Sequence, residues 1–299
     1  LRVERGALPG ENATAASPSD FTVCTFNLHG LGRGAEQHPD PADYDAALAR
    51  RARIIAGTLA GCTLIGLQET GAPADAEALA SLMVQIGQEL GRHMSAVISD
   101  MSQPLGRAVG NALEVKEAIA TLHGAGPADF TDLVLTVSAE MVRLADAGYG
   151  REAGGERARL EAALHSGAAW QKFREFVSAQ GGDVATVDDP SHLAQAAIVA
   201  PCVAPTAGYV AAINTEEVGL TVVDLGGGRA KKGDSIDPAV GLIFAARLGD
   251  WVEAGQPLAL VHAQTRAALT AAQERLVAAI HIQAEPVSAP PLVHKIIRG

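Results

Sequence analysis

The sequence has few of the residues that mark several large classes of protein. Its three cysteines, Cys24, Cys62 and Cys202, are far apart and form no Cys-x-x-Cys or Cys/His ligand spacing. This argues against a disulfide framework and a zinc site, and indicates free thiols in a reducing compartment. No apolar run is long enough to span a bilayer, and the N-terminus lacks the basic and apolar blocks of a signal peptide. We therefore expect a cytoplasmic protein with no membrane partner.

Basic residues are in the minority throughout the chain. The net charge is −11; residues 1–75 hold six Lys/Arg against nine Asp/Glu, and residues 76–299 hold seventeen against twenty-five. Neither part offers the broad basic surface that non-specific nucleic-acid binding uses, so a nucleic-acid partner is not expected. A hydrophobic content of 48% with 19% charged residues is typical of a folded protein.

The first 75 residues have the pattern of a partial β-α-β unit. Residues 1–19 are rich in Ala, Pro, Ser and Gly and are expected to be loose. Alternation from Phe21 to Phe26 predicts a strand, helical spacing of apolar residues from 44 to 59 predicts a helix, and the apolar run at 62–67 predicts a buried strand.

From Ala76 the pattern changes to a series of helices and then, near Val199, to strands. Helices are predicted over 76–90, 113–122, 130–145, 155–166, 168–180, 191–196 and 269–282. Strands are predicted over 95–98, 208–213, 220–225, 240–244 and 257–262. The glycine-rich stretch from Gly226 to Gly233 is interpreted as a hairpin between two of these strands, since no helix follows it as a phosphate cradle requires.

These patterns divide the chain into four parts. A loose N-terminus (1–19) is followed by the partial β-α-β stub (20–75), an α/β region of mostly helices (76–198) and an α+β C-terminal module (199–299). The predicted fold class is therefore α/β followed by α+β.

Two short motifs lie in the stub. Thr25-Phe-Asn-Leu-His29 ends the first predicted strand, and Leu67-Gln-Glu69 ends the second. Together they resemble the start of the endonuclease/exonuclease/phosphatase superfamily. That resemblance implies a divalent-metal site at Asn27 and Glu69, because a carboxylate oxygen suits Mg²⁺ and the metal stabilises charge on a phosphate.

A longer set of motifs lies beyond residue 76, where the sequence pattern changes. The blocks in order are Ser99-Asp-Met-Ser-Gln-Pro-Leu-Gly106, Ala108-Val-Gly-Asn-Ala-Leu-Glu-Val-Lys-Glu-Ala118, Leu225-Gly-Gly-Gly-Arg-Ala-Lys-Lys-Gly-Asp234, Ile236-Asp-Pro-Ala-Val-Gly241 and Ala246-Arg-Leu-Gly-Asp250. Five blocks in one region resemble the rear half of the pyrimidine-nucleoside (thymidine) phosphorylase family.

The resemblance implies a pentosyltransferase of nucleoside salvage that works as a homodimer. In its reaction a phosphate oxygen displaces the pyrimidine at the anomeric carbon, reversibly, so the expected partners are a pyrimidine nucleoside and the co-substrate phosphate. The resemblance also implies a potassium site formed by backbone carbonyls of Leu105 and Ala108 and the carboxylate of Glu117.

The family's catalytic face is not found in these 299 residues. Its phosphate loop contains Lys-His-Ser, and its base-binding Arg, Ser and Lys precede the helix at Ala76; neither pattern occurs here. We therefore predict no catalytic or substrate-binding residues and no activity. Two alternatives stay open: a divalent-metal phosphodiesterase, and a non-enzymatic interaction module or chimeric fusion fragment.

Overall fold

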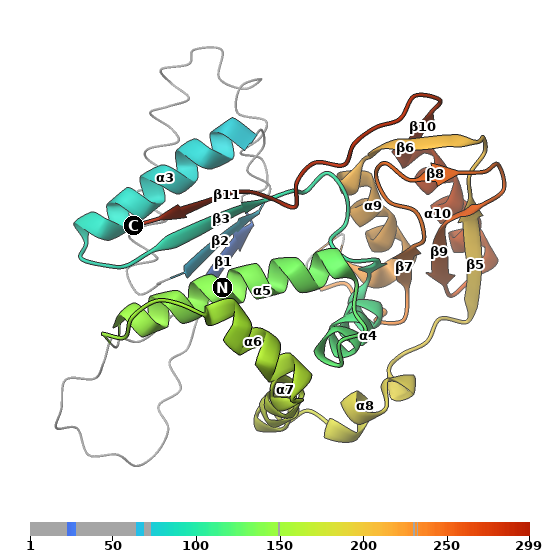
Figure 1. Ribbon diagram of the computed structural model, residues 1–299. Coiled ribbons are helices and arrows are strands. Elements are labelled where there is room, and N and C mark those ends of the chain that lie inside the picture. Colours follow the sequence, from blue (N-terminus) through green and yellow to red (C-terminus); the bar gives the residue numbers. More distant parts are fainter. Residues whose placement is uncertain (1–22, 28–63, 69–72, 149, 230, 232) are drawn as a thin grey trace. The chain divides into compact units, whose positions relative to one another are not determined.

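The computed structural model describes residues 23–27, 64–68, 73–148, 150–229, 231 and 233–299. The chain forms two compact units, each held together by its own internal contacts. Figure 1 shows the elements of both units. The first comprises residues 1–95, 143–153 and 298–299, and the second comprises residues 96–142 and 154–297. Within the described ranges, no helix combines the length and the apolar character needed to cross a membrane.

The N-terminal strands form a parallel pair. β1 (Val23–Asn27) and β2 (Leu64–Gln68) lie in a register that pairs Asn27 with Gln68, and β2 also pairs at Leu64 with Ser95, where β3 (Ser95–Ser99) begins. The sheet order is β1-β2-β3-β11, with β11 at Val293–Arg298. Both strands predicted within 20–75 are confirmed. The helix predicted over 44–59 lies outside the described residues.

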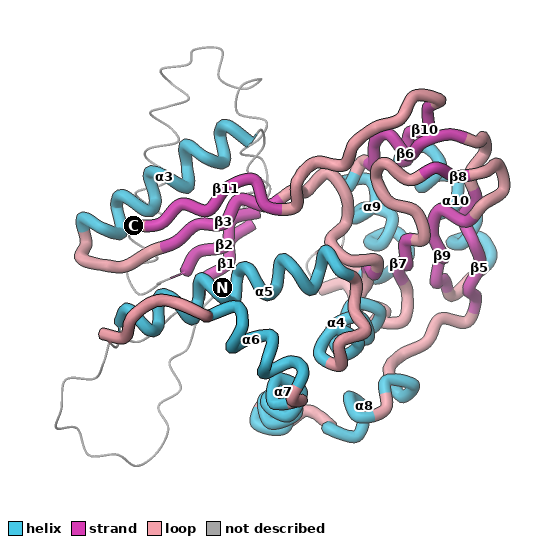
Figure 2. The backbone as a smooth tube through the Cα atoms, in the orientation of Figure 1, coloured by secondary structure: helices cyan, strands magenta, loops and turns pink. Residues whose placement is uncertain are grey.

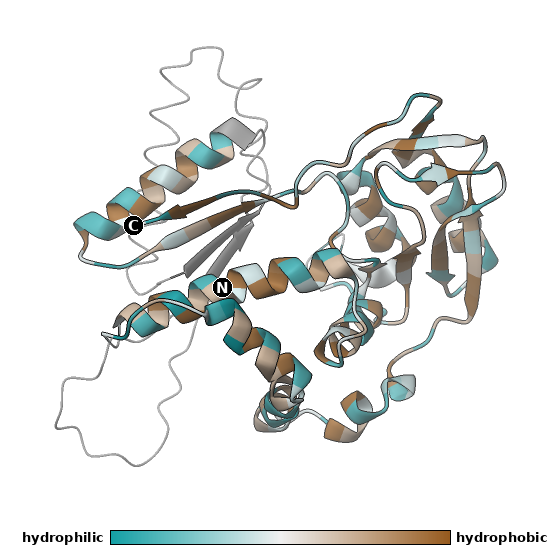
Figure 3. Cartoon of the chain, viewed as in Figure 1, coloured by the Kyte–Doolittle hydropathy of each residue, from teal (hydrophilic) through white to brown (hydrophobic). Residues whose placement is uncertain are grey.

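A helical series connects this sheet to the C-terminal module, as predicted. It consists of α3 (Pro73–Glu89), which precedes β3, and then α4 (Asn111–Leu122), α5 (Ala128–Gly148), α6 (Glu156–His165) and α7 (Ala168–Ala179). Brown and teal bands alternate along α5 in Figure 3, as expected of an amphipathic helix.

The short helix predicted over 191–196 is wrong in position. Helical structure comes earlier, in α8 (Val184–Asp188) and in the 3₁₀ turn η1 (Pro190–His192). The reason is capping: Asp183 accepts a hydrogen bond from the Ala185 N–H, and Asp189 accepts one from the Ser191 N–H. The residue after η1, Leu193, has an extended backbone.

The C-terminal module is built around two antiparallel sheets, one of which also includes a strand from residues 108–109. One sheet has the order β4-β7-β9-β5 and the other has the order β10-β6-β8. The strands are β4 (Ala108–Val109), β5 (Ile198–Val203), β6 (Gly208–Ile213), β7 (Gly241–Phe244), β8 (Trp251–Val252), β9 (Pro257–Ala263) and β10 (Ile280–Gln283). The helices are α9 (Thr215–Val222), which continues into the turn η2 (Val223–Gly227), and α10 (Arg266–Ala279).

The main core lies inside this module. Leu242 of β7, Val261 of β9 and Leu276 of α10 have no exposed surface, and they belong to one contiguous apolar cluster. Burial of this cluster between sheet and helices stabilises the module, since each fully buried large apolar side chain contributes roughly 1.5–3 kcal/mol.

The strand predicted over 220–225 is wrong, because these residues belong to α9 and η2, drawn as helix in Figure 2. The β-branched composition favoured a strand, but the buried positions Val218, Thr221, Val222 and Leu225 recur at helical spacing. Asn214 caps the helix by accepting a hydrogen bond from the Glu217 N–H.

The structure also corrects two further predictions, on the glycine-rich stretch after α9 and on the end of the last helix. The glycine-rich stretch is not a hairpin between strands, because Gly226, with φ of 100°, ends a helical segment. The helix predicted over 269–282 ends at Ala279, where Ile280 starts to pair with Ile213 of β6.

Candidate functional site

The turn from Pro104 to Ala108 leads from β3 into β4, just before α4, and holds two of the predicted potassium ligands, Leu105 and Ala108. The carboxylate of Glu117, one and a half turns into α4, accepts hydrogen bonds through Oε1 from the Arg107 N–H (2.9 Å) and the Ala108 N–H (3.1 Å). Gly106 has φ of 68°, and a Cβ added to it would lie 2.2 Å from Glu117 Oε2. Glycine at this position is what lets the carboxylate lie against the turn.

Burial controls the electrostatics of this carboxylate. It raises the pKa of Glu117, against the lowering effect of the two backbone hydrogen bonds, and the nearby Asp129 raises the pKa further. Nearby positive charge favours the ionised form of a partly buried acid that lies next to a second acid.

Arg247, from the turn after β7, supplies that charge. Its Nη1 donates to the carbonyl oxygens of Pro104 (2.7 Å) and Gly106, and its Nη2 donates to Asp129 Oδ2 at 2.5 Å. Asp129 also accepts a hydrogen bond from the Gly106 N–H at 3.1 Å. Burial lowers the pKa of Arg247, whereas the carboxylate of Asp129 raises it; an arginine remains charged in either case.

A second arginine makes the reciprocal contacts. Arg107 Nη1 donates to the carbonyl oxygens of Phe244 (3.1 Å) and Ala245 (3.0 Å). The Leu248 N–H donates to Gln103 Oε1 at 3.1 Å. Two segments far apart in the sequence, 103–107 and 244–248, are thereby joined through guanidinium and backbone groups.

The structure brings the three predicted residues together in part. Ala108 contacts Glu117 directly, and Leu105 lies between the two residues whose carbonyls bind Arg247. The potassium site itself stays a prediction. Arg247 stands in the motif block Ala246–Asp250 and Asp129 in none, and their pairing was missed because they lie 118 residues apart with no recognisable ligand spacing.

The predicted divalent-metal pair is only partly visible. Asn27 ends β1 beside Gln68 of β2, and Glu69 lies outside the described residues. In the part of the chain that the structure describes, no three His, Cys, Asp or Glu residues gather as metal ligands. The divalent-metal site also stays a prediction.

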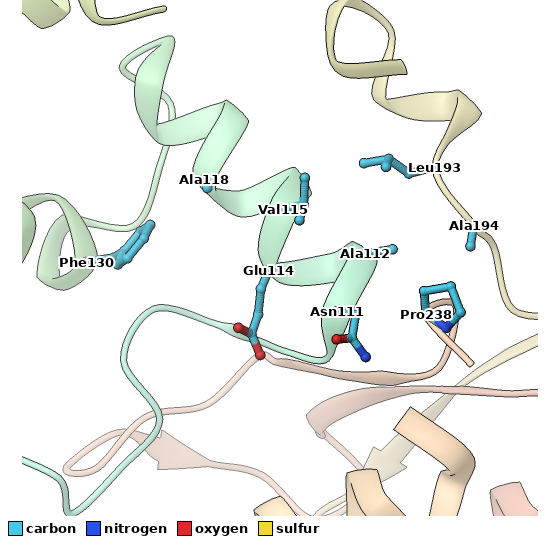
Figure 4. Close-up of a pocket in the computed structure, with 9 residues that line it drawn as sticks. All are labelled: Asn111, Ala112, Glu114, Val115, Ala118, Phe130, Leu193, Ala194 and Pro238. Carbon is cyan, nitrogen blue, oxygen red and sulfur yellow. The ribbon is translucent and has the colours of Figure 1, made fainter. Parts of the chain in front are cut away.

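A pocket of about 600 Å³ lies beside α4, with Phe130, Leu193, Ala194 and Pro238 around it (Figure 4). Its lining residues are Asn111, Ala112, Glu114, Val115, Ala118, Phe130, Leu193, Ala194 and Pro238. The lining contains no lysine or arginine, and its two polar residues are engaged elsewhere: Glu114 accepts from the Gly110 N–H, and Asn111 donates to the Gly227 carbonyl. An apolar, slightly acidic pocket does not suit a phosphate dianion.

The fold is thus a mixed α/β arrangement followed by an antiparallel module. Residues 209–283, from β6 to β10, match the family model of the pyrimidine nucleoside phosphorylase C-terminal domain. The pyrimidine-nucleoside phosphorylase of Geobacillus stearothermophilus is 46% identical over 220 residues, which is 74% of this chain and 50% of that protein. The enzyme of the same name from Staphylococcus aureus (strain USA300) is 46% identical over 223 residues, which is 75% of this chain and 51% of that protein.

These comparisons support the pyrimidine-nucleoside phosphorylase family for the C-terminal region of the chain. The chain spans about half the length of the curated relatives it matches. The resemblance of residues 20–75 to the endonuclease/exonuclease/phosphatase superfamily is not supported by these matches.

Proposed function

We propose that residues 76–299 form the rear of the α/β lobe and the C-terminal domain of a pyrimidine-nucleoside phosphorylase. The observation that carries this proposal is the 46% identity over 220 residues to an enzyme of that name. Support also comes from the coincidence of the matched segment, 209–283, with the elements from β6 to β10. The reaction to which this region contributes is the reversible phosphorolysis of a pyrimidine nucleoside to free base and pentose 1-phosphate.

We further propose that the chain as written does not catalyse this reaction by itself. Displacement at the anomeric carbon needs cations that hold a phosphate dianion in line with the departing base. Lys-His-Ser does not occur in the sequence. The two arginines nearest the candidate turn, Arg107 and Arg247, donate to backbone carbonyls and to Asp129, and these contacts compete with phosphate binding.

A phosphorolysis assay tests both parts of this proposal. The purified chain is incubated with thymidine or uridine and phosphate, free base is measured, and the Geobacillus stearothermophilus enzyme serves as the positive control. We expect no base above the blank from this chain. Turnover that requires phosphate would contradict the proposed inactivity and support the family reaction. Light scattering on the same sample tests the homodimer that the resemblance implies.

A second candidate is a divalent-metal phosphodiesterase. It requires that the ends of the two motif strands lie together, and the pairing of β1 with β2, which sets Asn27 beside Gln68, is consistent with that requirement. Its test is hydrolysis of bis(p-nitrophenyl) phosphate with Mg²⁺ and with EDTA. Metal-dependent hydrolysis that is lost in Glu69→Ala would support this candidate. Absence of both activities, together with self-association, would favour a non-enzymatic module.

A further inference from the structure

The backbone N–H and carbonyl groups of the Pro104–Ala108 turn bind side chains of opposite charge. Its N–H groups face carboxylates: Gly106 donates to Asp129, and Arg107 and Ala108 donate to Glu117. Two of its carbonyl groups, those of Pro104 and Gly106, face the guanidinium of Arg247. The turn is therefore held by two carboxylates through its N–H groups and by one guanidinium through its carbonyls, and Asp129 also binds that guanidinium.

The oxygen groups around Arg247 form a set that suits a hard cation. They are the two carbonyl oxygens and the carboxylate of Asp129, with the carboxylate of Glu117 attracting the same charge. Carbonyl and carboxylate oxygens are the ligands that metal cations of low polarisability prefer. Here the ligand of these oxygens is a side chain of the protein.

The arrangement is sheltered from solvent. The Arg247 side chain is 16% exposed and the Asp129 side chain is 29% exposed, so water and salt screen their attraction less than they screen a surface pair. Removing one member of such a pair leaves the other charge and its hydrogen-bonding groups without compensation.

We propose that Arg247 is the built-in cation of the Pro104–Ala108 turn and positions it without a metal ion. This differs from the potassium dependence that the family resemblance implies for the neighbouring residues Leu105, Ala108 and Glu117. In the unaltered chain, potassium adds nothing to the order of the turn. When the guanidinium is removed, the exposed oxygen set accepts a small monovalent cation in its place.

The experiment uses the full chain and three variants. Arg247→Met removes the charge and keeps much of the side-chain volume, and Arg247→Lys keeps the charge but loses the forked donor geometry. Arg275→Met is the matched control, because Arg275 also bridges two carboxylates, those of Glu217 and Asp224, away from the turn. Amide hydrogen exchange and thermal unfolding are measured in potassium, sodium and choline chloride at equal ionic strength.

For the unaltered chain we expect equal melting temperatures in the three salts and equal protection of the amides of Gly106, Arg107 and Ala108. In Arg247→Met these amides should exchange about tenfold faster or more in choline, and potassium or sodium should restore part of the protection in a saturable way. Arg247→Lys should lie in between. Arg275→Met should lose stability while these amides keep their protection.

Three results would overturn the proposal. The first is a saturable, potassium-specific stabilisation of the unaltered chain, which would show that the turn needs a metal ion. The second is unchanged exchange at residues 106–108 in Arg247→Met. The third is exchange that rises there but responds to no cation, which would reduce Arg247 to an ordinary packing residue. None of these readouts depends on phosphorolysis, so the outcome is independent of the proposed function.

Discussion

Gly241 at the start of β7 offers a sharp test of the packing that holds α4 on the C-terminal module. Its φ is 151°, and a Cβ added there would lie 2.4 Å from the carbonyl oxygen of Val109 and 3.0 Å from Cα of Gly110. Val109 ends β4, and Gly110 is the N-cap residue of α4. A methyl group at Gly241 therefore pushes directly on the backbone where the helix begins.

The expected cost of Gly241→Ala has two parts. Holding a residue with a side chain at this φ costs about 1–3 kcal/mol. The backbone collision separates β7 from β4 and loosens the packing around Leu113. Overpacking of this kind costs about 1–3 kcal/mol. A total of roughly 3 kcal/mol lowers the melting temperature by about 6–12 °C for a cooperative unit of about 200 residues.

Gly124→Ala is the matched control, because Gly124 also has a positive φ (78°) but no atom lies within 4 Å of the added Cβ. It should cost only about 1–2 kcal/mol, the price of the left-handed backbone. Both variants are compared by urea unfolding monitored by circular dichroism. Equal losses of unfolding free energy in the two variants would show that the close approach at Gly241 does not contribute.

Three further predictions address other parts of the second unit. Asn214→Ala removes the cap of α9 and should lower the free energy of unfolding by about 1 kcal/mol in urea titrations, whereas Asn214→Asp should retain it. Leu276→Ala, at a side chain with no exposed surface, should cost about 2–5 kcal/mol, against well under 1 kcal/mol for the exposed Leu220→Ala in the same assay. Cys202 is 1% exposed and burial raises the pKa of its thiol from 9.0 to about 11. Since the folded state holds this proton more tightly, stability from this group is constant below pH 9.0 and falls as pH rises above it. In a Cys24→Ser, Cys62→Ser background, maleimide labelling at neutral pH should be slow until denaturant is added, and fast labelling of the native chain would contradict the burial.

Much of the second unit's secondary structure follows from apolar spacing. The helix α4 and the strand β6 were predictable because their buried residues recur at a regular period, whereas α6 and α7 contain no fully buried residue and each begins directly after a glycine with a left-handed backbone. The β-branched composition of residues 220–225 predicts a strand, whereas the helical spacing of the buried positions agrees with the helix that forms. The capping side chain of Asn214, six residues upstream, was the signal that could have corrected the prediction.

Only part of the candidate site could be predicted from the sequence. Glu117 and the turn before α4 could be found through motif resemblance. Gly106 could be found because a tight turn favours glycine. Arg247 lies in the motif block Ala246–Asp250, but its role could not be predicted, because it depends on the folding of residues 244–248 against 103–107 and no local pattern encodes a contact over 143 residues. Side-chain contacts of this range are set by tertiary packing, which a single sequence does not reveal.

The order of strands in the β4-β7-β9-β5 sheet decides where this chain can be cut. The family match covers 209–283, yet two of the sheet's four strands, β4 at 108–109 and β5 at 198–203, lie outside it. A fragment with the boundaries of the match would leave β9 without β5 and β7 without β4, with unpaired backbone groups on both sides of a hydrophobic sheet. The cooperative folding unit therefore extends about a hundred residues upstream of the matched segment, and an expression fragment should begin before Pro104.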